Sequence, residues 1–92
     1  SCKCAENHLG KIFSGEIISI LDFGVFVHIE ELNIEGFCHV RNLKRAPYYI
    51  HDEISRSLRS VNNNHIYSIG DRCKIKIESV EIIRNRIDLK LT

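Results

Sequence analysis

The sequence has almost no excess charge and no long hydrophobic run. Its 92 residues include 13 Lys and Arg against 12 Asp and Glu, which gives a formal net charge of +1. This excludes a polycation that holds nucleic acid by overall charge, so any such contact must come from local clusters of basic residues. Asp22 and Gly24 break the longest apolar run after a few residues, and the sequence therefore predicts no membrane span.

Methionine and tryptophan are absent, and proline occurs once. The missing initiator methionine leads us to expect a segment excised from a longer chain, and the start lacks the apolar stretch of a signal peptide. One domain is expected, because a single core is normally built from about 50 to 200 residues. We predict a lead-in segment over residues 1–9 and a monomeric, cytoplasmic domain over residues 10–92.

Four cysteines raise the alternatives of a disulfide or a zinc site. Cys38 and Cys73 fall at inward positions of strand patterns, where a free thiol acts as a small hydrophobic side chain. Cys2 and Cys4, with His8 downstream, match the spacing of zinc ligands poorly, so we expect no metal. Free thiols fit a reducing cytosol.

Isoleucine and valine supply most of the apolar content and favour strands, and the alternation is clearest over residues 21–29. One face of this strand can enter a core through Val25, Val27 and Ile29. Phe26 and His28 share the other face, and Phe23 lies on the preceding turn. Two aromatic rings displayed by a rigid strand suit the faces of unstacked bases. The alternative is that Phe26 packs beneath a loop.

Four further strands are expected over residues 10–20, 34–40, 72–78 and 86–91. Gly15 is predicted to bend the first of them, as small barrels require. The strand over 72–78 points Arg72, Lys74 and Lys76 outward as a basic stripe. Five strands with short turns predict an all-β fold, a five-stranded OB-type barrel that binds oligonucleotides around its second and third strands.

Residues 48–68 form an insertion between strands three and four. Asn62-Asn63-Asn64 is a strong turn signal, which predicts a hairpin with arms over 58–60 and 65–68. A short helix over 52–59 is the alternative. No nucleophile, base and orienting group can be argued from the sequence, and no phosphate-cradling glycine loop is present, so we expect no catalysis by this chain.

Several short motifs, in order along the chain, resemble the S1 RNA-binding domain. They are Gly10-x-Ile12, Gly15-x-Ile17, Phe23-Gly24-Val25-Phe26-Val27, Gly36-Phe37-Cys38-His39-Val40, Gly70-Asp71 and Arg86-Ile87-Asp88-Leu89. The resemblance covers Gly10 to Thr92. The insertion is similar to that of the terminal S1 domain in the ribonuclease II and R family, through Tyr48-Tyr49-Ile50-His51-Asp52, Leu58 and Tyr67-x-x-Gly70-Asp71-Arg72.

The resemblance implies a surface for single-stranded RNA made by Phe23, Phe26, His39 and Arg86, and Lys74 and Arg84 are candidate helpers that would neutralise phosphates. Phe13 and Phe37 are expected to pack rather than bind. The acidic residue that many S1 domains place in the last turn would fall near Ile83, which is apolar, and Glu81 is a displaced candidate.

The resemblance also implies a bacterial 3′–5′ exoribonuclease as the parent protein. Its separate catalytic domain, in the same chain, would use magnesium, whereas this domain would need no cofactor and would hold RNA for it. Two alternatives stay open. They are an S1 domain of another RNA-processing or translation protein, and an OB-type module that binds proteins through its exposed phenylalanines.

Overall fold

The computed structural model describes residues 5–43, 49–61 and 65–92. These ranges contain eight strands and one short 3₁₀ helix. They are β1 (Ile12–Leu21), β2 (Gly24–Ile29), β3 (Ile34–His39), η1 (Val40–Asn42), β4 (Tyr49–Asp52), β5 (Ser57–Ser60), β6 (Ile66–Ser68), β7 (Arg72–Glu81) and β8 (Arg86–Leu91). None of the helices described is long and apolar enough to cross a membrane.

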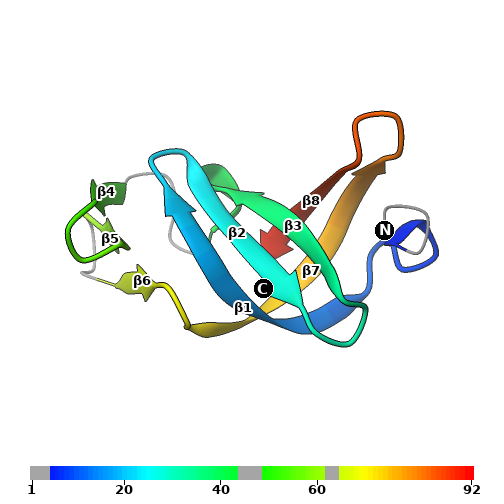
Figure 1. Cartoon of the computed structure of the whole chain (residues 1–92), viewed down its shortest axis with the longest axis horizontal. Coiled ribbons are helices and arrows are strands. Elements are labelled where there is room, and N and C mark those ends of the chain that lie inside the picture. The colour runs from blue at the N-terminus through cyan, green and yellow to red at the C-terminus, as the bar shows by residue number, and fades with distance from the viewer. Residues whose placement is uncertain (1–4, 44–48, 62–64) are drawn as a thin grey trace.

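Five strands close into a barrel in the order β1, β2, β3, β8 and β7, and then return to β1 (Figure 1). All neighbours run antiparallel except β3 and β8, which pair in parallel at Phe37 and Asp88. Closure removes the unpaired strand edges at which sheets aggregate. The predicted five-stranded OB-type barrel is confirmed.

The core fills the inside of this barrel. Its fully buried side chains include Ile17, Val25, Val27, Ile29, Cys38, Ile75, Ile77 and Leu89. Complete burial of one branched aliphatic side chain contributes about 1.5–3 kcal/mol to folding. The strands that supply these side chains alternate as the sequence predicted, so their other faces are free to carry function.

Gly15 lets β1 and β2 approach each other closely. A Cβ at this position would overlap Cγ1 of Val27 and lie 3.2 Å from the carbonyl oxygen of His28. The irregularity that interrupts the β1–β2 register lies farther along β1, between Ile17 and Ser19. The bulge of β1 thus lies after Ile17, and the bend at Gly15 stays a prediction.

Several predicted strand boundaries shift by one to three residues. β1 begins at Ile12, although the amide of Gly10 still donates to the carbonyl of Ile77 at 2.8 Å. β3 ends at His39 because Val40 begins η1. β7 continues to Glu81, because Val80 and Glu81 keep their pairing with β8 after a bulge.

The insertion forms a three-stranded sheet in the order β4-β5-β6, at the end of the barrel where β1 turns into β2 (Figure 1). The two hairpin arms are confirmed as β5 and β6, although the asparagine turn between them lies outside the described residues. The alternative helix over 52–59 is wrong. The Asp52 carboxylate accepts the amides of Ile54 at 3.0 Å and Ser55 at 3.2 Å, which makes a turn between β4 and β5.

The described part of the lead-in segment packs on the barrel. Ala5 is fully buried, and the His8 ring meets the Phe13 ring edge-on at a centroid distance of 5.5 Å. Cys2 and Cys4 lie outside the described residues. The boundary at residue 10 stays a prediction.

Cys38 and Cys73 are free thiols, as predicted. Cys38 is fully buried, whereas Cys73 is only partly covered. Burial raises the pKa of the Cys38 thiol to about 12 and that of the Cys73 thiol to about 11, because a thiolate loses its hydration in the interior.

Both thiols are therefore expected to react slowly with Ellman's reagent at about pH 8 in the folded chain. The folded pKa values lie above the ordinary value of 9.0, so the stability linked to these protons is complete below pH 9.0 and is lost as pH rises through 11 to 12. The measurement uses a Cys2→Ser, Cys4→Ser variant. Labelling of both thiols at the rate seen in the denatured chain would contradict this expectation.

Candidate nucleic-acid interface

Four rings cluster on the outer face of β2, β3 and the turn before β2, and we call them the aromatic platform: Phe23, Phe26, Phe37 and His39. Phe37 lies at the centre. Its centroid is 5.4 Å from that of Phe23, 5.1 Å from that of Phe26 and 6.3 Å from that of His39. The rings are tilted or edge-on to one another, which is the usual geometry of aromatic contacts.

The β2–β3 register brings these rings together. Phe26 lies opposite Phe37, and Gly24 lies opposite His39. A Cβ on Gly24 would come within 2.5 Å of Cζ of Phe37, so the glycine leaves room for that ring. Phe23 lies on the β1–β2 turn with 54% of its surface exposed.

Phe37 is predicted to pack rather than to bind, and it does pack against other rings of the platform, while its part in binding stays a prediction. It is half-buried and joins Phe23 to Phe26, which were predicted to lie close to each other. Its outward parity with His39 was the available signal. Phe13 is buried in the core, as predicted.

His39 also ends β3. Its Nδ1 accepts the amide of Arg41 at 3.2 Å, and so the ring caps η1. An acceptor at Nδ1 requires the proton of the neutral ring to be on Nε2. The platform therefore presents an N–H donor beside its aromatic faces.

Arg86 lines an open pocket of about 490 Å³ together with two rings of the platform, Phe26 and Phe37. The Nε of Arg86 donates to Oδ1 of Asp88 at 3.0 Å, and Oδ2 of Asp88 accepts the Ser79 hydroxyl at 2.9 Å. This pairing orients the guanidinium and leaves its Nη groups to face an anion, a geometry suited to phosphate.

Besides Arg86, four polar residues also line this pocket: His28, Asn33, Glu35 and Asn85. His28 Nε2 lies 3.1 Å from Oδ1 of Asn33, so the two side chains hold each other across the β2–β3 turn. Sequence reasoning placed His28 on the outer face and did not include it among the site residues.

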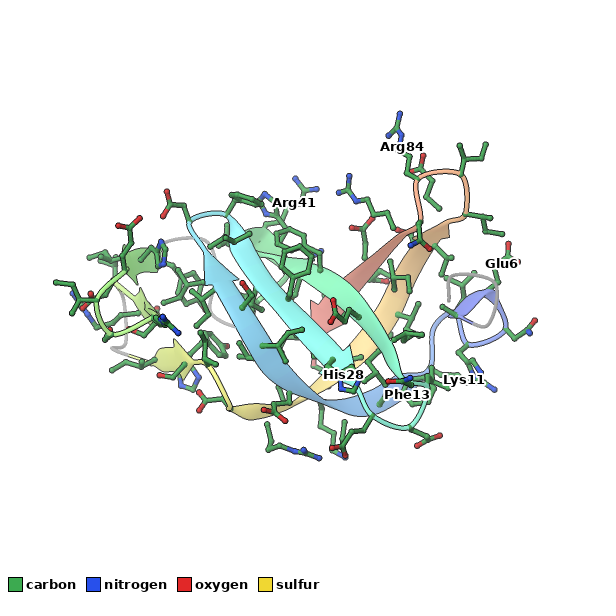
Figure 2. The ribbon with its side chains drawn as sticks, in the orientation of Figure 1. Glu6, Lys11, Phe13, His28, Arg41 and Arg84 are labelled. Carbon is green, nitrogen blue, oxygen red and sulfur yellow. The ribbon has the colours of Figure 1, made fainter. Side chains whose placement is uncertain are left out.

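Lys74 and Arg84 lie away from the aromatic platform. Lys74 is on β7 beside β1, where its Nζ donates to the Ser14 hydroxyl at 2.8 Å. Arg84 extends from the tip of the β7–β8 turn, as Figure 2 shows, and its Nε is 3.3 Å from Oε1 of Glu81. Ile83, near which the family's acidic residue would fall, is 98% exposed. The structure thus brings Phe23, Phe26, His39 and Arg86 around one surface but not these two helpers.

Acidic partners moderate the basic stripe on β7. Arg72 is 4.0 Å from Glu16 and 3.8 Å from Glu30, and Lys76 is 4.0 Å from Glu78. These are exposed or partly exposed pairs of the kind that contributes little to stability. They lower the net positive charge of this side of the barrel.

One group of possible metal ligands occurs among the described residues: Asp22, His51 and Glu53, whose ligand atoms lie within 4.8 Å of one another. His51 already pairs with Asp22, and both carboxylates are exposed to solvent. Exposed acidic groups of this kind are common without an ion, and the expectation of no metal stays a prediction.

The family model of the S1 RNA binding domain matches residues 6–92. The chain belongs to the S1 RNA-binding domain family. This S1 domain is 32% identical over 90 residues to ribonuclease R of Escherichia coli, and the match spans 98% of the chain but 11% of that enzyme. It is 33% identical over 84 residues to ribonuclease R of Thermotoga maritima, which covers 91% of the chain and 12% of that enzyme.

Solved structures of ribonuclease R from Mycoplasma genitalium share the fold of this S1 domain. The apo enzyme superposes with a TM-score of 0.86 and 30% identity over 96% of the chain and 14% of that protein. The enzyme in complex with ribose-methylated single-stranded RNA gives a TM-score of 0.89 and 28% identity over 99% of the chain and 14% of that protein. The chain thus corresponds to a small part of these relatives.

The His39 contact predicts the tautomer of that ring in the S1 domain. Its neutral form should carry the proton on Nε2, because Nδ1 accepts the Arg41 amide. Long-range ¹H–¹⁵N correlation spectra at alkaline pH distinguish the two tautomers by their nitrogen shifts. A neutral ring with its proton on Nδ1 would show that His39 does not cap η1.

Proposed function

We propose that this S1 domain binds single-stranded RNA through the aromatic platform and Arg86. The single observation that supports the proposal most strongly is the continuous cluster of Phe23, Phe26, Phe37 and His39 beside an oriented guanidinium. Bases stack on the ring faces, His39 donates from Nε2 to a base or sugar oxygen, and Arg86 neutralises a phosphate.

Stacking supplies most of the proposed affinity. A base on an aromatic ring is worth about 1–3 kcal/mol, whereas the chain has a net charge of only +1 to attract the phosphate backbone. Each phosphate that the domain neutralises lowers the slope of log affinity against log salt by about 0.7 for a single strand. The domain should therefore show a shallow salt dependence and little sequence preference.

Lys74 and Arg84 have smaller proposed roles. Lys74 is hydrogen-bonded to Ser14 on the β1–β7 side of the barrel, and Arg84 is paired with Glu81. Each can meet only a strand that extends beyond the platform. We propose that both side chains attract the RNA phosphates only at long range. At 0.1 M ionic strength, salt largely screens such attraction beyond about 10 Å.

We further propose that the parent protein is a bacterial, cytoplasmic 3′–5′ exoribonuclease in which this domain captures RNA for a separate catalytic domain of the same chain. The similarity to ribonuclease R over 98% of this chain and the solved relative bound to single-stranded RNA support this. The magnesium that such an enzyme uses would belong to the catalytic domain. The chain by itself is proposed to be a monomeric RNA-binding module without catalysis or cofactor.

The proposal is tested by fluorescence anisotropy with a labelled single-stranded RNA of about ten nucleotides, a length on the scale of one OB-fold site. The chain should bind with an affinity that falls as salt rises. A Phe23→Ala, Phe26→Ala variant should lose at least about tenfold, because two stacking surfaces are removed. Circular dichroism confirms that the variant is folded.

Two control variants are measured in the same salt series, one matched to the double phenylalanine variant and one matched to Arg86→Gln. Ile54→Ala removes an apolar side chain that is 97% exposed on the insertion, and it should leave affinity unchanged. Arg86→Gln should weaken binding and flatten the salt slope, whereas Arg72→Gln, on the β1–β7 side, should do much less. Equal affinity of the parent chain and the double phenylalanine variant would refute the platform and favour a protein partner for the exposed rings.

A further inference from the structure

The inserted sheet contacts the turn that carries Phe23. Asp22 and Phe23 together form the turn between β1 and β2. The carboxylate of Asp22 pairs with Nδ1 of His51, which belongs to β4 of the insertion. One residue of the turn is thus held by the insertion, while its neighbour forms an edge of the aromatic platform.

His51 is the fixed member of this pair. In the β4–β5 ladder it lies opposite Leu58, which is fully buried and belongs to the same hydrophobic cluster as the barrel core. The His51 side chain is 14% exposed, whereas that of Asp22 is 80% exposed. A largely buried donor on a strand anchored in the core therefore restrains an otherwise exposed turn.

The opposite side of the turn has a second support. The carbonyl of Phe23 accepts the amide of Val40 at 2.9 Å, which ties the turn to the start of η1. These two contacts restrain the turn relative to η1 and β4. Without His51, only the contact to Val40 remains of these two.

We propose that His51 is a positioning residue for RNA binding, and that the inserted sheet sets the orientation of Phe23 through Asp22. This rests on the proposed function of the platform. A stacking ring gains affinity when it is already held in the bound geometry, since ordering it on binding costs free energy. The insertion contributes no ring to the aromatic platform. Through the contact between His51 and Asp22 it would instead affect RNA binding by orienting Phe23.

The test combines variants in a double-mutant design with the same RNA. His51→Ala should weaken binding roughly three- to tenfold, the size expected for the net contribution of one ordinary hydrogen bond. In the Phe23→Ala background, the same substitution should cause no further loss, because the ring it orients is absent. His51→Asn should restore affinity, since the Asn amide places a donor near the position of the histidine Nδ1.

Asp22→Ala approaches the same contact from its exposed side and should reproduce the loss without destabilising the insertion. His65→Ala is the matched control, because His65 belongs to the inserted segment and its ring lies 4.5 Å from that of Tyr67. Aromatic ¹H–¹³C spectra should show the Phe23 ring shifting in His51→Ala and Asp22→Ala but not in His65→Ala.

The outcomes separate this inference from the function beneath it. If Phe23→Ala weakens binding but His51→Ala and Asp22→Ala do not, the positioning role is refuted and the platform stands. If the free-energy losses of His51→Ala and Phe23→Ala add in the double variant, His51 acts independently of the Phe23 ring and the inference fails. If Phe23→Ala has no effect on RNA binding, the proposed function fails together with the inference.

Discussion

The pairing of β2 with β3 in one register is the constraint on which the rest of this structure depends. It places Phe26 opposite Phe37 on the outside and Val25 opposite Cys38 on the inside. A slip of one residue would exchange the two faces, because side chains alternate along a strand. Packing of the core therefore stabilises this register. The same register brings the rings of the aromatic platform together, so no separate conformational entropy is lost to position their strands.

Charge has a secondary role in this arrangement. Arg86 is held by Asp88, and Arg72 and Lys76 lie beside glutamates, so the positive charge of these three side chains is partly offset. A platform of rings with one oriented guanidinium is expected to bind single-stranded RNA more through base stacking than through electrostatic attraction to phosphates. Under the proposed function, such a surface is expected to bind RNA with little preference for base sequence.

The sequence predicted the barrel because its strands alternate: β7 up to Ile77 and β8 over Arg86–Leu91 show inward and outward positions. It missed β4, whose side chains are only half-buried or exposed and thus show no core face. The parity of Phe37 was readable, but its central place was not, since that depends on which outward residues of separate strands become neighbours. The place of Lys74 depends on strand neighbours in the same way, because β7 pairs with β1 as well as β8 and turns this side chain toward Ser14, whereas Arg84 lies on the β7–β8 turn beside Glu81.

We propose that single-stranded RNA lies across the outer face of β2, β3 and β8. The most direct measurement is a titration of the isotope-labelled chain with single-stranded RNA, followed by amide, aromatic and arginine side-chain NMR shifts. The largest changes should centre on the rings of Phe26 and Phe37 and on the guanidinium of Arg86. Changes centred instead on Arg72 and Lys74, with the aromatic rings unmoved, would contradict the account.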